Sequence, residues 1–201
     1  MATSQSGCLL RKAKVLSWIQ IVEIAIDGAR GLWFLHTYPE GCIVHRDIKP
    51  TNILIDANFR AKLSDFGLSK VMEVDQSHVS SEVRGTFGYV DPEYRKNHHV
   101  NASGDVYRFG VVLLQLLSGQ RARFLARGGD ITQLADPKLN GEYSVEGFEL
   151  ILKLAFSCTG LKQQRPSMEQ VVSGLEKAFE ISKQVKSFTS PSLAFNGDRN
   201  L

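Results

Sequence analysis

Apolar residues recur along several segments of this chain at the spacing of an α-helix. The first segment runs from Ser17 to about His36, where apolar side chains return every three or four positions. Ser17 and Gln20 stand at its start in the order of a capping box, in which the two side chains bond backbone amides reciprocally. The pattern therefore predicts an amphipathic helix from Ser17 that ends before a turn at Gly41.

Three later segments also predict helices. Residues 105–117 are apolar on nearly every side, which is typical of a fully buried helix. Residues 148–158 and 168–179 each carry an apolar face with helical spacing. From there the sequence turns polar and loses its period, so we expect a flexible tail over residues 183–201.

Between the first two helical segments the chain has the pattern of short β-strands. Residues 43–44, 53–55 and 61–63 are rich in branched apolar side chains, and residues 57–60 indicate a turn. Residues 70–88 form a long polar stretch, and a loop of that length in a compact domain is usually functional or disordered. The prediction is a mainly α-helical fold with a small β-hairpin element.

Composition limits the function classes that remain. The 201 residues can form one domain, and a hydrophobic content of 43% is ordinary for a soluble globular protein. The net charge of +3 is too small and too scattered to predict nucleic-acid binding. The longest apolar run, residues 109–117, is far shorter than the roughly 20 residues that a bilayer requires, so we expect no membrane span. Three widely spaced cysteines and an N-terminus without a signal peptide favour the cytoplasm.

Two polar motifs flank the predicted hairpin. Residues 45–52 have the sequence HRDIKPTN, and residues 65–67 have the sequence DFG. Phosphoryl transfer depends mainly on positioning the reactants and neutralising phosphate charge. Carboxylate and amide oxygens are also the ligands that Mg²⁺ accepts. The residue types therefore suit a site that handles a metal-bound phosphate.

With its later motifs, the chain resembles the eukaryotic protein kinase family, most closely the plant receptor-like Ser/Thr kinases of the leucine-rich-repeat or malectin-like type. The later motifs are GTFGYVDPEY at residues 85–94, DVY at 105–107 and RPSM at 165–168, in family order. The resemblance implies a protein kinase-like C-lobe over residues 17–182, preceded by a lead-in at residues 1–16 that is disordered or a remnant.

The resemblance also implies a role for each motif residue. Asp47 corresponds to the catalytic base, and Lys49 would neutralise the transferring phosphate and help bind the nucleotide. Asn52 and Asp65 would hold Mg²⁺, so the implied cofactors are ATP and Mg²⁺. A Lys two positions after Asp47 is the Ser/Thr-kinase pattern.

Other motif residues have structural roles in the family. Asp105 would anchor the catalytic loop, and Arg165 would pair with Glu93. The remaining structural positions are His45, Arg46, Phe66 and Gly67. His45 could also pass for a catalytic or metal-binding histidine, but a core role is favoured.

The long polar stretch contains candidates for regulation. In the family, the arginine at position 46 is held by a phosphorylated activation loop, and phosphate pairs well with arginine. The candidate acceptors are Ser77, Ser80, Ser81 and Thr86. The alternative for each is an ordinary hydroxyl in a solvated loop.

The sequence departs from the family in three places. The family's small lobe would need roughly 36 residues before any connections, at about 5 per strand and about 11 for its helix, whereas 16 precede Ser17. Residues 120–129 are shorter than the docking segment of relatives. Gly104 and Arg108 stand where the family usually has Ser, and Arg108 must find a partner or reach solvent.

These observations leave two hypotheses. The first is the C-lobe of an ATP-dependent Ser/Thr kinase in signal transduction, with weak or absent Mg-ATP binding and no activity as an isolated chain. The second is a non-catalytic, pseudokinase-like module that pairs with or competes against full-length receptor kinases. In either case we expect a protein substrate or partner kinase, self-association through the exposed lobe interface, and a place at the intracellular side of the plasma membrane.

Overall fold

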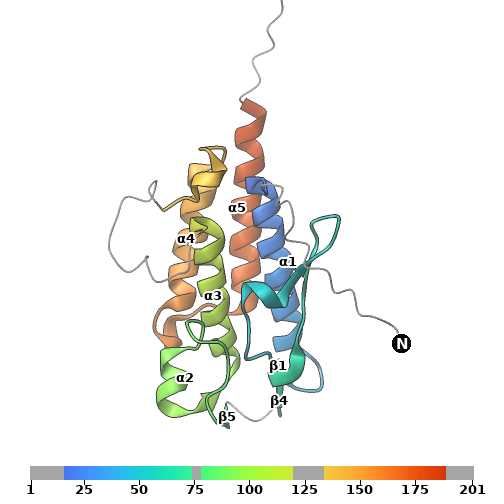
Figure 1. The fold of residues 1–201 in the computed structure, drawn as a ribbon, viewed down its shortest axis with the longest axis vertical. Coiled ribbons are helices and arrows are strands. Elements are labelled where there is room, and N and C mark those ends of the chain that lie inside the picture. Colours follow the sequence, from blue (N-terminus) through green and yellow to red (C-terminus); the bar gives the residue numbers. More distant parts are fainter. Residues whose placement is uncertain (1–15, 74–77, 120–133, 189–201) are drawn as a thin grey trace, which may run out of the picture.

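The computed structural model describes residues 16–73, 78–119 and 134–188. Within these ranges, four long helices lie side by side, and short strands lie both beside them and near the lower end of the bundle (Figure 1). The helices are α1 (Trp18–His36), α2 (Pro92–Asn97), α3 (Ala102–Ser118), α4 (Val145–Thr159) and α5 (Met168–Phe188). The strands are β1 (Cys42–Val44), β2 (Ile53–Ile55), β3 (Ala61–Leu63), β4 (Lys70–Met72), β5 (Val79–Ser80) and β6 (His99–Val100). Single 3-10 turns lie at Pro50–Asn52, Phe66–Leu68, Pro137–Leu139 and Lys162–Gln164.

Helix α1 begins as its sequence predicts. The Ser17 amide donates to Gln20 Oε1 at 3.0 Å, and the Gln20 amide donates to Ser17 Oγ at 3.3 Å. These bonds satisfy amides that an uncapped helix would leave unpaired. The buried face is wider than the predicted stripe, because Trp18 and Leu32 are buried as well.

The core lies where the four long helices meet. Helix α1 packs on α5, α5 on α4, and α4 on α3. Val22, Phe109, Phe148 and Leu175 are fully buried in this core. Helix α3 starts at Ala102, earlier than predicted, because the Asn101 side chain accepts from the Gly104 amide and caps it.

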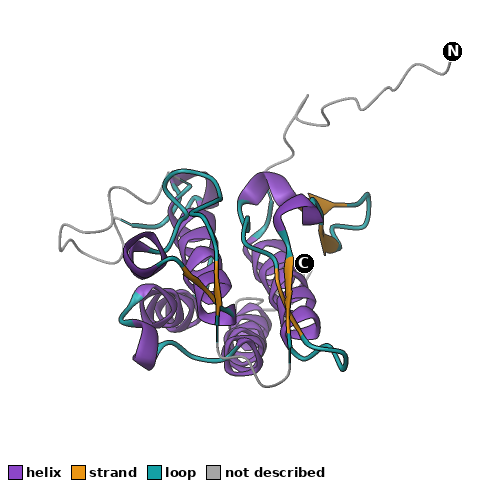
Figure 2. Ribbon diagram, turned by 90° about the horizontal axis from the view of Figure 1, so that it is seen from below, coloured by secondary structure: helices purple, strands orange, loops and turns teal. Residues whose placement is uncertain are grey.

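The strands form two-stranded antiparallel pairs: β2 with β3, β1 with β4, and β5 with β6. Seen from below in Figure 2, the helices appear end-on with strand pairs beside them. The β2–β3 pair confirms the predicted hairpin. The other two pairs place strands β4 and β5 inside the polar stretch 70–88, which we had expected to be one loop. Their partners are distant in sequence, so the local pattern did not reveal them.

The C-terminal helix extends beyond the predicted boundary. Helix α5 continues to Phe188, whereas we expected the flexible tail to begin at Lys183. The last turns are held to the bundle because Trp18 Nε1 donates to Ser182 Oγ at 2.8 Å. The predicted lead-in up to residue 15, the shortened segment at 120–129 and the end of the tail lie outside the described residues.

None of the helices in the described ranges is both long and apolar enough to cross a bilayer.

Candidate functional site

A buried carboxylate on α3 holds the loop that carries the HRD motif. Asp105 is completely buried and accepts from the backbone amides of His45 at 2.7 Å and Arg46 at 2.9 Å. His36 Nε2 lies 3.3 Å from Asp105 Oδ2. Burial alone would raise the pKa of Asp105, but His36, the charge of Arg108 and the Arg46 amide outweigh it and lower the pKa. Asp105 therefore has the anchoring position that the sequence predicts.

Asp47 is the centre of a second network. Its Oδ1 accepts from the Thr86 amide at 2.9 Å and the Thr86 hydroxyl at 2.8 Å, and its Oδ2 accepts from Lys49 Nζ at 2.7 Å. Asn52 Nδ2 donates to the Asp47 carbonyl at 2.9 Å. Burial tends to raise the pKa of Asp47, but the bonds from Lys49 and Thr86 prevail and lower it. The carboxylate is thus held ionised and oriented.

The β2–β3 hairpin brings the predicted metal-binding residues to the same place. Its register pairs Ile53 with Leu63, so Asn52 and Ser64 are neighbours where the two strands meet the motif loops. The Ser64 amide donates to the Asn52 carbonyl at 2.9 Å. Asp65 follows directly, with an exposed side chain and a left-handed backbone (φ 63°). Asn52 and Asp65 therefore lie at one edge of the hairpin.

The donor set at this edge fits Mg²⁺. The Asn52 amide nitrogen is occupied by Asp47, which turns the amide oxygen into the atom available to a metal. Asp65 offers an exposed carboxylate. Mg²⁺ in phosphate-transfer sites takes one or two protein ligands and completes its shell with water and phosphate oxygens. No three His, Cys, Asp or Glu side chains in the described part of the chain converge on a metal position.

The two motif loops also contact each other through an aromatic pair. The rings of His45 and Phe66 lie 5.1 Å apart, and His45 Nε2 lies 3.0 Å from the Ser64 carbonyl. His45 is fully buried, which agrees with the favoured core role, whereas Phe66 is 48% exposed. A Cβ atom at position 67 would lie 3.4 Å from Asp65 Oδ1, an ordinary van der Waals distance.

Arg46 contacts the polar stretch of residues 70–88, which is called the activation segment below. Its Nη1 donates to the Leu68 carbonyl at 3.3 Å. Its Nη2 donates to Ser81 Oγ at 3.2 Å, to the Glu82 carbonyl at 3.2 Å and to the Tyr94 hydroxyl at 2.9 Å. Arg46 therefore joins the DFG turn, the activation segment and α2.

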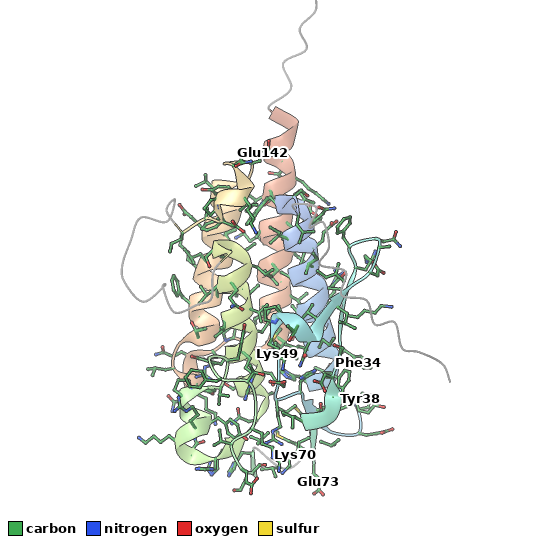
Figure 3. All side chains as sticks on the ribbon, in the orientation of Figure 1. Phe34, Tyr38, Lys49, Lys70, Glu73 and Glu142 are labelled. Atoms are coloured by element: carbon green, nitrogen blue, oxygen red, sulfur yellow. The ribbon has the colours of Figure 1, made fainter. Side chains whose placement is uncertain are left out.

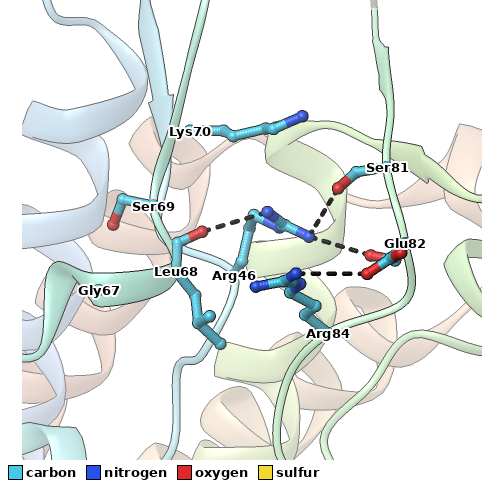
Figure 4. Close-up of a pocket in the computed structure, with 8 residues that line it drawn as sticks. All are labelled: Arg46, Gly67, Leu68, Ser69, Lys70, Ser81, Glu82 and Arg84. Carbon is cyan, nitrogen blue, oxygen red and sulfur yellow. Dashed lines mark hydrogen bonds and ion pairs between the residues drawn. The ribbon is translucent and has the colours of Figure 1, made fainter.

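The Arg46 side chain lines a cavity of about 340 Å³ that is rich in basic groups (Figure 4). Two polar atoms near it, Arg46 Nε and Ser69 Oγ, are buried without a hydrogen-bond partner among the described residues. The lining residues are Arg46, Gly67, Leu68, Ser69, Lys70, Ser81, Glu82 and Arg84. Three cationic side chains thus face this cavity.

The four candidate hydroxyls lie in different surroundings. Ser81 lies in the Arg46 cavity. Ser80 is exposed on β5. The Thr86 hydroxyl is bonded to Asp47 and to Lys49, so it belongs to the second network. Ser77 lies outside the described residues.

Arg165 has a different principal partner from the predicted one. Its guanidinium forms two bonds with Asp91, at 2.6 and 3.0 Å, and both side chains are nearly inaccessible to solvent. Glu93 Oε1 lies farther away, at 3.6 Å, and accepts from the Lys162 amide at 2.8 Å. Arg165 also lies over the ring of Tyr107, at 5.1 Å. Glu93 is therefore a secondary partner.

Sequence reasoning missed Asp91 and Tyr94. Asp91 caps α2, because its side chain accepts from the Glu93 amide at 3.0 Å, and an Asp directly before Pro92 is a recognisable cap signal. The Tyr94 hydroxyl donates to the Glu82 carbonyl at 2.6 Å. No local pattern distinguishes this buried tyrosine from an ordinary core residue.

Comparison with known proteins agrees with this geometry. Residues 3–189 match the family model of the protein kinase domain. A probable LRR receptor-like serine/threonine-protein kinase of Arabidopsis thaliana, MEE39, is 41% identical over 180 residues, which are 81% of this chain and 20% of that protein. A second probable LRR receptor-like serine/threonine-protein kinase of the same plant is 40% identical over 187 residues, 85% of this chain and 20% of that protein.

A probable LRR receptor-like protein kinase of Arabidopsis thaliana is 42% identical over 188 residues, 85% of this chain and 22% of that protein. The chain thus spans about a fifth of the length of the curated relatives it matches. With the anchored HRD loop, the DFG turn and the match over most of the sequence, this chain belongs to the protein kinase family, and it is similar to plant LRR receptor-like serine/threonine kinases.

Proposed function

We propose that this chain carries the lower half of the active site of an ATP-dependent Ser/Thr protein kinase that acts in signal transduction. The observation that supports this most is the Asp47 carboxylate, which Lys49 and Thr86 hold ionised at the end of the hairpin that carries Asn52. An ionised, oriented carboxylate suits a group that positions a substrate hydroxyl and accepts its proton.

In this proposal each residue has a separate task. Asp47 accepts a hydrogen bond from the substrate hydroxyl and then its proton. Lys49, whose ammonium lies 2.7 Å from Asp47, places positive charge beside the transferring phosphate. Asn52 and Asp65 would hold Mg²⁺, which neutralises phosphate charge when it is bound with ATP. Thr86 keeps Asp47 turned toward the substrate side.

We further propose that the 201 residues do not transfer phosphate by themselves. Each sheet in the described ranges has two strands. Positioning supplies about 7–11 kcal/mol of a barrier reduction only when both reactants are held. Mg-ATP contacted from one side would bind weakly.

Several exposed apolar side chains favour a protein partner for this chain. Phe34 and Val71 are each 62% exposed, and Leu54 is 57% exposed. The rings of Phe34 and Tyr38 lie 5.8 Å apart near one end of α1 (Figure 3). Such side chains suit a covering lobe, a second copy of this chain or a partner kinase. Size-exclusion chromatography with light scattering distinguishes a self-associating chain from a monomer.

The same exposure favours a second candidate function, a non-catalytic module that pairs with or competes against receptor kinases. For either function the names of the relatives suggest a place at the intracellular side of the plasma membrane. Regulation would act through Ser81, because a phosphate on its hydroxyl would meet Arg46, Lys70 and Arg84 in the cavity of about 340 Å³.

A phosphotransfer assay tests the proposal. The purified chain is compared with the same chain joined, at its N-terminal side, to the small lobe of one of the Arabidopsis relatives. We expect no turnover from the chain alone and Mg-ATP-dependent phosphorylation of a Ser/Thr peptide from the joined protein. Asp47→Asn should lower that rate by about 10²–10⁴-fold.

Each alternative result has a defined meaning. Turnover by the isolated chain would contradict its proposed inactivity. Equal activity of the joined protein and its Asp47→Asn variant would contradict the role of Asp47. A joined protein that folds but does not phosphorylate, together with an isolated chain that binds a receptor kinase, would favour the non-catalytic module.

A further inference from the structure

Arg108 is an unusual residue for the centre of a buried helix. It lies on α3 with 2% of its side chain exposed, among residues that are otherwise mostly apolar. Burying a guanidinium is costly unless charges or hydrogen bonds compensate it. The position therefore calls for a compensating arrangement around it.

The compensation comes from the same helix and from α2. Arg108 Nη1 donates to the Gly104 carbonyl at 2.9 Å and lies 4.0 Å from Asp105 Oδ1. The guanidinium carbon lies 5.7 Å from the centre of the Tyr94 ring. Its Nε and Nη2 are buried without a hydrogen-bond partner within the described residues, so the charge of Asp105 is the main compensation.

Gly104 makes this arrangement possible. A Cβ atom at position 104 would lie 3.2 Å from Arg108 Nη1, closer than most real contacts of a Cβ atom. Gly104 and Arg108 lie four residues apart on one face of α3, so they form one spatial unit.

The Arg108 guanidinium lies between the catalytic loop and the activation segment. A Cβ atom built on Gly85 would lie 3.0 Å from the Arg46 carbonyl and 3.4 Å from Arg108 Nη2. Gly85 precedes Thr86, which bonds Asp47. Arg108 is thus next to both the anchor of the loop and the turn that presents Thr86.

We propose that Arg108, accommodated by Gly104, is a positioning residue that fixes the catalytic loop by holding Asp105 as a carboxylate beneath the amides of His45 and Arg46. This inference rests on the proposed function only in that it takes the loop to be catalytic. A carboxylate accepts both amides, whereas a protonated Asp105 would leave one oxygen as a donor facing them.

Several titratable or charged groups surround Asp105 and Arg108, and a test that varies the pH must take them into account. His36 on α1 and Cys42 on β1 interact with Asp105, and Asp47, Asp91 and Tyr94 interact with Arg108. Burial raises the pKa of Asp105 by itself, and His36 and Arg108 lower it. Removing Arg108 should therefore raise the pKa of Asp105.

The test is the pH dependence of the loss of stability in Arg108→Met. Because the pKa of Asp105 is depressed in the folded protein, its stabilisation is present above the unfolded pKa and is lost as pH falls through the folded pKa. We expect Arg108→Met to reduce the folding equilibrium constant by a larger factor at pH 7 than at pH 3, because the Asp105 carboxylate that Arg108 favours is lost as the pH falls through its folded pKa. Urea unfolding of the full chain at several pH values measures this.

Three comparisons isolate the effect. Arg108→Lys keeps the charge, so the stability that this variant loses should differ little between pH 7 and pH 3. Arg30→Met removes an exposed arginine that pairs with Glu176 at 2.6 Å, and its effect should be small at both pH values. His36 also interacts with Asp105, so the series is repeated with His36→Gln, where Arg108 is the remaining basic side chain beside Asp105.

Hydrogen exchange supplies a second measurement if the variant unfolds in acid. At pH 7, Arg108→Met should speed exchange of the His45 and Arg46 amides at least tenfold more than exchange of the Leu175 and Ala178 amides in α5. A loss of stability that does not change with pH, or equal acceleration of all four amides, would overturn the inference. Either result would leave the phosphotransfer proposal intact, which depends on Asp47.

Discussion

The Arg165–Asp91 pair offers a sharp prediction about stability. Replacing Arg165 with Met keeps most of the aliphatic volume but leaves Asp91 as a buried carboxylate that has lost both bonds, at 2.6 and 3.0 Å. Breaking a buried ion pair from one side costs about 3–5 kcal/mol. Because domains are stable by about 5–15 kcal/mol, Arg165→Met should bring the chain close to unfolding.

Variants of the two acidic partners show which one carries the interaction. Asp91→Asn removes the charge, so it should lower the free energy of unfolding by about 3–5 kcal/mol. Asparagine can still cap α2, so loss of the cap should contribute little to this change. Glu93→Gln removes a charge that is 3.6 Å from Arg165 on a side chain that is 36% exposed. Because Glu93 is partly solvated and lies farther from Arg165 than Asp91 does, its loss should cost less, and this variant is the matched control.

Urea unfolding followed by far-UV circular dichroism gives the free energy of unfolding of each variant, and double-mutant cycles give the coupling energies. We expect the coupling of Arg165 to Asp91 to exceed its coupling to Glu93 by about 2 kcal/mol or more. If Glu93→Gln costs as much as Asp91→Asn, or the two couplings are equal, the argument from burial and bidentate geometry is refuted.

Three other predictions concern the core and the site. Gly110→Ala should destabilise the chain by about 1–3 kcal/mol in urea unfolding, because its Cβ would lie 2.6 Å from Cys158 Cβ. Thr86→Val should raise the pKa of Asp47 toward its ordinary value, because the Thr86 hydroxyl donates one of the hydrogen bonds that favour the charged form. Carboxyl ¹³C NMR measures this pKa, and an unchanged value would contradict the prediction. Burial raises the pKa of Cys158 to about 12, so a thiol reagent at pH 8 should label Cys42 much faster, and equal rates would contradict the burial.

Much of the fold could be predicted because local patterns determine it. The capping box at Ser17 and Gln20 is a short-range signal, and the hairpin of β2 and β3 is closed by a turn of a few residues. The two remaining strand pairs could not be predicted, because β1 pairs with β4, and β5 with β6, across many residues. Helix α5 continues to Phe188, past its predicted end, and Trp18 bonds Ser182 in a contact between distant parts of the sequence that no local pattern reveals.

In the candidate site, too, some features follow from local sequence patterns and others depend on contacts between distant residues. Motif order predicts Asp47, Asn52 and Asp105 as site residues, and their positions follow from the loops and the helix that carry them. The choice of Asp91 over Glu93 by Arg165 depends on side-chain directions at the start of α2, and both acids fit the sequence pattern equally well. The sequence marks Arg108 as a departure from the family pattern, but only the packing around α3 shows that it lies beside Asp105.

The central claim is that Asn52 and Asp65 hold the metal of Mg-ATP from below. Mn²⁺, a paramagnetic substitute, can be added with excess ATP to the isotopically labelled chain, and line broadening then locates the metal. The account predicts selective broadening at Asn52 and around Asp65, and its loss in Asp65→Ala. Broadening at other surfaces, or a pattern that Asp65→Ala leaves unchanged, would contradict the claim.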